Sequence, residues 1–174
     1  LFLSALLVRE YIDFPSNWRA TESLKSYLDR HDIMGVEELD TRAITRYIRT
    51  RGSQRAALTT SADPISAVVA RIKKSPHMAG QNLVDEVAID QRYEWSSPAN
   101  PRFNVAVIDC GVKYNIMRIF SELGCACTVF PPSVTADEIL NGPFDGVFIS
   151  NGPGDPEPVT HVVGTLRNLL GKKP

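Results

Sequence analysis

Three short apolar segments, separated by helical patterns, constrain the fold of this chain more than any other feature of its sequence. They are Phe103–Asp109, Cys125–Phe130 and Gly146–Ser150, and each is rich in Val, Ile, Phe or Ala. Strands that are apolar on both faces and alternate with helices are typical of a parallel sheet that helices cover on both sides. The sequence therefore predicts an α/β fold with a doubly wound, mostly parallel sheet in residues 101–174.

Residues 1–100 carry a different pattern, which mixes strands and helices and predicts a separate amino-terminal domain. The expected elements are strands at Ala5–Ile12 and Arg55–Thr60 and helices at Glu22–His31, at Thr41–Arg51 and from Asp63 onward. Asp40 and Asp63 precede helical patterns, as N-cap residues do, and Gly52 ends the second helix. Proline and glycine then break the pattern up to Ser96–Pro101, which has the composition of a linker. We therefore place the domain boundary near residue 100.

The composition argues against several classes of function. With 19 basic and 20 acidic residues the net charge is -1, so a nucleic-acid surface is not expected. The apolar start, Leu1–Val8, is too short to span a bilayer, so no membrane contact is expected either. The three histidines are far apart in sequence, which argues against a metal site. The three cysteines lack a paired spacing and predict free thiols in a reducing cytoplasm.

The third apolar segment runs directly into a Gly-Pro-Gly turn, which is the strongest functional signal in the chain. Gly152 and Gly154 have no Cβ, so a substrate is able to approach the main chain closely. Pro153 and Pro156 remove two donors and stiffen the loop, so the remaining amides point in fixed directions. Such amides bind an anion, or an oxyanion that develops during a reaction, at the carboxyl end of a strand. An ordinary strand-to-helix connection is the alternative interpretation.

The turn after the first apolar segment, Asp109–Lys113, supports other functions less well. It lacks the three glycines of a dinucleotide-binding turn. Asp109 and Lys113 resemble the acidic and basic pair of a receiver domain, but a receiver begins with a cluster of acidic residues. Cys110 follows a strand, as activated thiols often do, yet it lacks flanking glycines and a nearby histidine. We therefore interpret Cys110 as a structural thiol and assign no catalytic residue in this chain.

Arginines at helical spacing mark the helix expected at Thr41–Arg51. Arg42, Arg46 and Arg49 share one face, opposite the apolar residues of the same helix. A solvated surface is the ordinary reason for such a stripe. The alternative interpretation is a docking surface for an acidic partner.

Several stretches of the sequence together carry a resemblance to a known family. Phe148–Pro156 is similar to the oxyanion-strand motif of class I glutamine amidotransferases, the type that uses a catalytic triad. Pro15–Leu24 and Leu39–Arg46 resemble the small (glutaminase) subunit of carbamoyl-phosphate synthetase. Val107–Ile116 is similar to the first strand and turn of that subunit's amidotransferase domain. The similarity covers essentially all 174 residues in the same order.

The resemblance implies a function, a substrate and a partner. The family's small subunit hydrolyses L-glutamine to glutamate and ammonia in the cytoplasm, and the ammonia passes to a large subunit in a heterodimer. The large subunit makes carbamoyl phosphate from bicarbonate and ATP, so ATP and Mg²⁺ are expected on that partner and no cofactor on this chain. Gly152 and Gly154 match the family's glutamine-binding glycines, whose loop contributes a backbone amide to the oxyanion hole. The catalytic Cys, His and Glu are expected beyond Pro174.

The same resemblance predicts how the chain is organised. Residues 1–100 are expected to be part of the small subunit's amino-terminal domain with a linker, and residues 101–174 the first half of the amidotransferase domain. Both ends interrupt a pattern, so we expect an internal fragment that is inactive alone. Two alternatives stay open: a non-catalytic module that docks onto a larger subunit, and a fragment of another class I amidotransferase, such as a guanylate or anthranilate synthase component. Carbamoyl phosphate serves both arginine and pyrimidine synthesis, and the residues are compatible with either.

Overall fold

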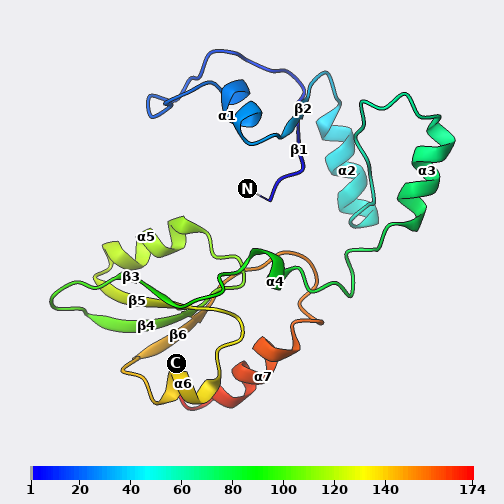
Figure 1. Cartoon of the computed structure of the whole chain (residues 1–174). Coiled ribbons are helices and arrows are strands. Elements are labelled where there is room, and N and C mark those ends of the chain that lie inside the picture. Colours follow the sequence, from blue (N-terminus) through cyan, green and yellow to red (C-terminus); the bar gives the residue numbers. More distant parts are fainter. Residues whose placement is uncertain (1) are drawn as a thin grey trace. The chain divides into compact units, whose positions relative to one another are not determined.

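The computed structural model describes residues 2–174, which form two compact units, one ending at Pro76 and one starting at His77 (Figure 1). This division falls upstream of the boundary expected near residue 100. The reason is that residues 77–100 supply a short helix, α4 (Val84–Val87), and a strand, β3 (Tyr93–Ser96), to the second unit. Because β3 pairs within the sheet of that unit, the proline-rich stretch after it connects two strands of one sheet.

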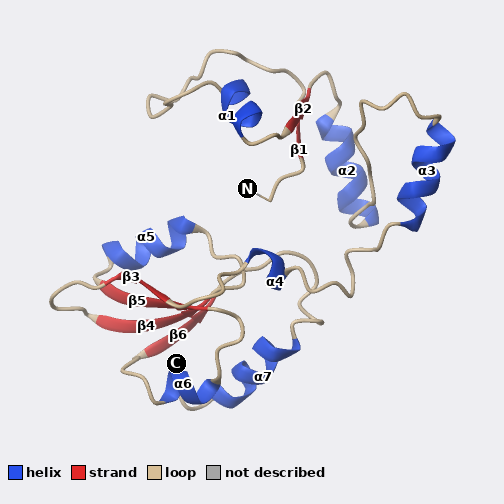
Figure 2. Cartoon of the chain, viewed as in Figure 1, coloured by secondary structure: helices blue, strands red, loops and turns tan. Residues whose placement is uncertain are grey.

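The first unit contains little sheet and three separate helices (Figure 2). Its elements are β1 (Ala5–Leu7), α1 (Leu24–Arg30), β2 (Met34–Val36), α2 (Thr41–Arg51) and α3 (Ile65–Lys74). β1 and β2 pair in parallel, with α1 in the connection between them. β1 is shorter than the expected strand at Ala5–Ile12, and β2 has no counterpart among the expected strands.

Two expected features of the first unit are wrong. Arg55–Thr60 is irregular rather than a strand, because no strand of the described chain pairs with it. The Arg55 guanidinium instead donates to two backbone carbonyls at the end of α3. Asp63 does not cap α3, because Pro64 occupies the N-cap position. The Asp63 carboxylate pairs instead with Arg71, 2.7 Å away.

The second unit is built on a four-stranded sheet with the order β3-β5-β4-β6. Its remaining elements are β4 (Phe103–Ile108), α5 (Tyr114–Glu122), β5 (Cys125–Phe130), α6 (Ala136–Leu140), β6 (Gly146–Ile149) and α7 (Thr160–Leu169). β4 pairs in parallel with both β5 and β6, whereas β3 is antiparallel to β5. The three predicted strands, the helical segments between them and the mostly parallel sheet are therefore confirmed, while α4 and β3 have no predicted counterpart.

Side chains of β4 alternate between the two faces of the sheet and so contribute to two cores. Val105 and Val107 pack in one cluster with Met117 of α5. Ala106 and Ile108 pack in the other cluster, which contains buried residues of α6 and α7. Figure 1 shows the same arrangement, with α5 on one face of the sheet and α6 and α7 on the other. The expectation of strands that are apolar on both faces is therefore confirmed. The helices that pack on both faces hold the ends of the strands in place.

Candidate functional site

The Gly-Pro-Gly loop leaves the sheet at the carboxyl end of β6, beside the turn that follows β4. The two strands are parallel neighbours, so both segments emerge at the same edge. Ser150 continues the pairing, since its amide donates to the carbonyl oxygen of Ile108 at 3.1 Å. The Cys110 amide in turn donates to the Ser150 hydroxyl at 2.8 Å. These two bonds tie the start of the loop to the neighbouring strand and turn.

The turn after β4 is organised by the buried carboxylate of Asp109. One of its oxygens accepts the amides of Gly111 and Val112, at 2.8 and 2.7 Å. The other oxygen accepts the amide of Ile89 at 3.1 Å. Because backbone donors already use both oxygens, Asp109 acts as an anchor of the turn. The receiver-like interpretation, in which Asp109 works with Lys113, therefore has no support in the structure.

Gly152 occupies a position where two backbones approach closely. A Cβ at this residue would lie 2.6 Å from the carbonyl oxygen of Cys110 and 3.1 Å from a methyl group of Val84. Real Cβ atoms essentially never lie as close as 2.6 Å to another heavy atom, so any other residue would displace the loop or the turn. The glycine therefore serves the packing of the loop as well as the access that the sequence suggested.

Gly154 is required by its backbone conformation, and the residue after it fixes the loop from the other side. Its φ of +74° lies in the left-handed region, and a Cβ there would also lie 3.0 Å from Leu83. Asp155 accepts the amides of Gly80 and Glu157, both at 3.0 Å. The hydrogen bond from the Glu157 amide, followed by that from Gly80, lowers the pKa of the Asp155 carboxyl. The loop is therefore held between the sheet and the segment around α4.

The amides of Gly152 and Gly154 are free donors at this edge of the sheet. Both residues are exposed, and neither N–H donates to an acceptor within residues 2–174. In the neighbouring turn, by contrast, Asp109 already accepts the amides of Gly111 and Val112. An anion or oxyanion that approaches the edge therefore meets available donors in the loop after β6. The structure brings the two predicted site residues together in one short, braced loop.

The three cysteines are all buried and free. Burial, with smaller contributions from the carboxylates of Asp109 and Asp85, raises the pKa of the Cys110 thiol to about 11. The thiolate is the nucleophilic form of cysteine, so a thiol with this pKa is a poor nucleophile near neutral pH. Cys125 and Cys127 are buried in β5, where they pack in the core. These observations support the interpretation of Cys110 as a structural thiol.

The arginine stripe lies on α2, whose ends agree with the prediction. The Asp40 carboxylate caps the helix by accepting the Ala43 amide at 2.9 Å. Arg42, Arg46 and Arg49 are all exposed, and none forms a salt bridge within the described part of the chain. The opposite, apolar face of α2 is also partly exposed, and no residue of the helix is buried. The structure thus leaves both faces of α2 accessible within the first unit.

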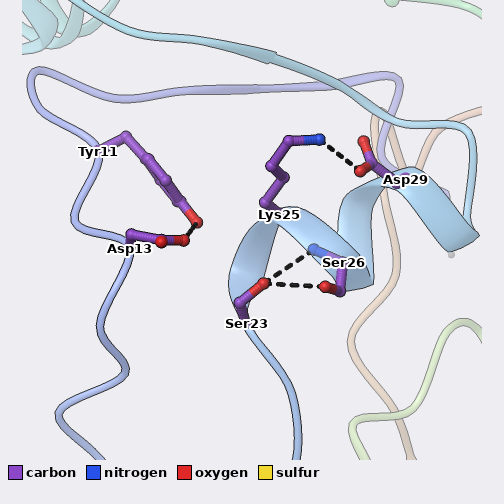
Figure 3. Close-up of polar contacts among 6 residues, drawn as sticks. All are labelled: Tyr11, Asp13, Ser23, Lys25, Ser26 and Asp29. Atoms are coloured by element: carbon purple, nitrogen blue, oxygen red, sulfur yellow. Dashed lines mark hydrogen bonds and ion pairs between the residues drawn. The ribbon is translucent and has the colours of Figure 1, made fainter.

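The first unit contains a cavity of about 320 Å³ that the sequence did not predict. It lies among β1, α1 and β2, and most of its lining is apolar. The polar groups near it are already paired, as Figure 3 shows: the Tyr11 hydroxyl donates to Asp13 at 2.8 Å, and Lys25 pairs with Asp29 at 2.6 Å. The neighbouring carboxylates raise the pKa of Tyr11 and of Lys25. Ser23, the N-cap of α1, completes this surface group, to which we assign no function.

The described residues contain neither a membrane-spanning helix nor a cluster of metal-ligating side chains. Within residues 2–174, no helix combines the length and apolar character needed to cross a membrane. Nor do three His, Cys, Asp or Glu side chains of these residues gather closely enough to hold a metal ion. The loop after β6 is therefore the site that the described residues support best.

Sequence reasoning missed the residues that brace this loop. Asp155 precedes a proline and accepts the amide two residues later, which is a recognisable turn signal. Ser150 carried no signal, because a serine at the end of a strand has many ordinary explanations. Leu83 and Val84, which contact the loop, are far from it in sequence and were assigned to a region without clear structure.

Comparison with protein families gives two matches. Residues 1–58 match the CPSase domain of the carbamoyl-phosphate synthase small chain, and residues 106–174 match glutamine amidotransferase class-I. The second match runs from β4 through α7 and includes the Gly-Pro-Gly loop. The second part of the chain is therefore similar to class I glutamine amidotransferases, and its α/β fold is consistent with that match.

Curated relatives identify the family more closely. The carbamoyl phosphate synthase small chain of Syntrophotalea carbinolica is 38% identical over 185 residues, which cover 99% of this chain and 49% of that protein. The corresponding protein of Synechocystis sp. is 39% identical over 185 residues, covering 98% and 48%. The chloroplastic small chain of Oryza sativa subsp. japonica is 39% identical over 184 residues, covering 99% and 41%. This chain belongs to the carbamoyl-phosphate synthase small-chain family, and it spans about half the length of the curated relatives it matches.

The family matches also test the alternative that the chain comes from another class I amidotransferase. A guanylate or anthranilate synthase component would not explain the match of residues 1–58 to a domain of the small chain, so that alternative is set aside. The assignment of residues 1–100 and 101–174 to the two family domains stays a prediction, because the matches leave residues 59–105 uncovered.

Proposed function

We propose that this chain is part of the glutamine-hydrolysing small subunit of carbamoyl-phosphate synthase. In this proposal the complete subunit releases ammonia from L-glutamine and delivers it to a large subunit. That partner, which would hold ATP and Mg²⁺, combines the ammonia with bicarbonate to make carbamoyl phosphate for arginine or pyrimidine synthesis. The observation that carries the proposal is the pair of free amides, on Gly152 and Gly154, in a braced loop at the carboxyl edge of the sheet.

The chemistry of glutamine hydrolysis explains why such amides are useful. Attack of a nucleophile on the side-chain amide of glutamine converts its carbonyl oxygen into an oxyanion. Backbone N–H groups that are fixed beforehand stabilise this charge as it develops, and loss of one such donor typically costs about 3 kcal/mol of transition-state stabilisation. Gly152 and Gly154 would supply donors of this kind on one side of the substrate. The loop would therefore be half of a catalytic site.

We assign the nucleophile, and the His and Glu that would support it, to residues outside 1–174. The three cysteines of this chain are unsuited to the role, because all are buried and the pKa of Cys110 is raised to about 11. An oxyanion site without a nucleophile does not hydrolyse glutamine, so this chain alone should be inactive. We place the intact enzyme in the cytoplasm, where free thiols such as these persist.

The experiment that tests this proposal compares glutamate release by two purified proteins. The 174-residue chain should release none above background, whereas the small subunit at the length of its relatives, assembled with the large subunit, should hydrolyse glutamine. A variant of the 174-residue chain with all three cysteines replaced is the matched control. Glutamate release by the short chain that persists in this variant would contradict the assignment of the nucleophile. A complete, assembled subunit that failed to hydrolyse glutamine would contradict the proposed function itself.

A second role, docking onto the large subunit, is favoured by the exposed arginine stripe of α2. A stripe of like charge that forms no salt bridge with any carboxylate of the described residues is electrostatically suited to an acidic surface on another protein. Charge reversal of Arg42, Arg46 and Arg49 should weaken capture of the large subunit and make the remaining capture less dependent on salt. Reversal of Arg118, an exposed arginine of α5, is the control and should leave capture unchanged. Equal effects of the two changes would contradict a docking role for the stripe.

A further inference from the structure

Ser150, the residue that joins β6 to the Gly-Pro-Gly loop, makes two hydrogen bonds through one hydroxyl group. The side chain is buried, with 7% of its surface exposed. Its oxygen lies 2.8 Å from the amide nitrogen of Cys110 and 2.8 Å from the carbonyl oxygen of Asn151. The Cys110 amide is only a donor and the Asn151 carbonyl only an acceptor. The hydroxyl must therefore accept from Cys110 and donate its single proton to Asn151.

This second bond fixes the direction of the peptide group between Asn151 and Gly152. The described residues contain no cis peptide bond, so the carbonyl and the N–H of this planar group point in opposite directions. With the Asn151 carbonyl held toward the buried Ser150 hydroxyl, the Gly152 N–H must point away from it. In that direction it meets no acceptor within residues 2–174. The orientation of the free donor thus depends on a hydroxyl group next to it.

The neighbouring contacts show why this peptide group needs a hydrogen bond that fixes its direction. Glycine allows the peptide on its amino-terminal side to rotate more freely than other residues do. The close approach of Gly152 to the Cys110 carbonyl excludes a Cβ there, so the loop cannot restrict this rotation with a bulkier residue. The side-chain amide of Asn151 donates to the Gly111 carbonyl at 3.3 Å, which positions the residue but does not hold its own carbonyl. Only Ser150 among the described residues bonds that carbonyl.

We propose that Ser150 is a positioning residue that aims the Gly152 amide at the oxyanion of the substrate. The inference rests on the proposed function, because it names the group that orients a donor of that same site. Ser150 does not contact the substrate in this account. It acts through the Asn151–Gly152 peptide, and its bond from Cys110 couples that peptide to the turn after β4.

The kinetic test uses the complete small subunit assembled with the large subunit. Replacement of Ser150 by alanine should lower kcat for glutamine by roughly 10- to 100-fold, somewhat less than complete removal of an oxyanion donor, and change KM by less than about twofold. Synthesis supported by added ammonia should be unchanged. Ser150→Thr keeps the hydroxyl and should restore most of kcat.

The control removes a different buried hydroxyl that also donates to a backbone carbonyl. Thr165 of α7 is 9% exposed and donates to the Val134 carbonyl at 2.9 Å, away from the loop. Thr165→Val should therefore destabilise the second unit without lowering kcat for glutamine. A fall in kcat for this variant as large as for Ser150→Ala would overturn the inference, because the effect would then follow from lost stability.

A structural test does not depend on activity. In a crystal structure of the 174-residue chain with Ser150→Ala, the Asn151–Gly152 peptide should be rotated, or should occupy more than one orientation. An unchanged peptide, or a wild-type kcat for Ser150→Ala, would overturn the inference. A complete wild-type subunit without glutaminase activity would instead overturn the proposed function, and the orientation of the peptide would then decide the inference by itself.

Discussion

The two compact units differ in how their elements are stabilised. In residues 77–174 the sheet is covered on both faces, and each face has its own cluster of buried side chains. Among residues 2–76 only Leu28 and Ile33 are buried apolar side chains, while large residues such as Phe14 and Trp18 are at least 80% exposed. The second unit is therefore stabilised by a buried apolar core, whereas the first buries few apolar side chains and gains less from packing.

The helices show the same contrast. α2 has an aspartate cap and a glycine at its end, yet none of its residues is buried. α5 has no side-chain cap, but its Met117 is completely buried against the sheet. Good local signals thus specify where a helix begins and ends, but they do not provide a core. The candidate site lies in the packed unit, where a rigid edge is able to hold backbone amides in fixed directions.

The largest expected effect is on stability, and it is seen when one isoleucine is truncated in each unit. Ile108 of β4 is 0% exposed and Ile44 of α2 is 37% exposed. Ile108→Ala should lower the free energy of unfolding of the second unit by about 3–4 kcal/mol, because it removes buried apolar surface and leaves a cavity. Ile44→Ala should cost less than about 1 kcal/mol. Urea unfolding, followed by Trp95 fluorescence in a Trp18→Phe background and by circular dichroism, measures both changes in the free energy of unfolding. Similar losses in the two variants would contradict the difference between the units.

The next prediction concerns the thiol beside the candidate loop. Burial raises the pKa of Cys110 from 9.0 to about 11, so the folded unit should react with a thiol reagent at least about tenfold more slowly than the urea-unfolded chain at pH 8. The folded state retains the proton that the unfolded state loses, so this group's contribution to stability should fall between about pH 9 and pH 11. Fast labelling of Cys110 in the folded chain at pH 8 would show that the edge of the sheet beside Cys110 opens readily, which contradicts its burial.

The smallest effects on stability should come from loss of the helix caps. They test the same difference between the two units. Asp40→Ala and Thr135→Ala each remove a cap worth about 1 kcal/mol. In α2, which buries no residue, the loss should expose the backbone amides of the helix to hydrogen exchange. In α6, where Ala136 and Ile139 are buried, protection should largely persist. Equal loss of protection in the two helices would indicate that packing does not support α6.

Much of the fold followed from local patterns in the sequence. The three strands of the parallel sheet were found because each is a continuous apolar run, and α2 because a capping aspartate and a final glycine bound it. β2 and β3 were missed because each has at most four residues and depends on pairing with strands distant in sequence. Arg55–Thr60 had the composition of a strand but no partner strand.

The candidate site was predictable only in part, for a related reason. A lack of side chains at Gly152 and Gly154 is visible in the sequence, and it was enough to suggest a loop with accessible amides. The contact of Gly152 with the Cys110 carbonyl and the bond from the Cys110 amide to the Ser150 hydroxyl depend on how two strand ends lie side by side. Such contacts arise from tertiary structure, so no sequence pattern within the loop predicts them.

The central claim, that the Gly152 amide serves glutamine hydrolysis, is tested most directly by one pair of glycine substitutions. In the complete small subunit assembled with the large subunit, carbamoyl phosphate synthesis is measured with glutamine and then with added ammonia. Gly152→Ala forces a Cβ to within 2.6 Å of the Cys110 carbonyl, whereas Gly164→Ala in α7 meets nothing within 4 Å.

Gly152→Ala should lower the glutamine-supported rate by about 100-fold or more and leave the ammonia-supported rate within about twofold of wild type. Gly164→Ala should leave both rates unchanged. A Gly152→Ala enzyme that uses glutamine as well as wild type, or that loses both activities equally, would contradict the account.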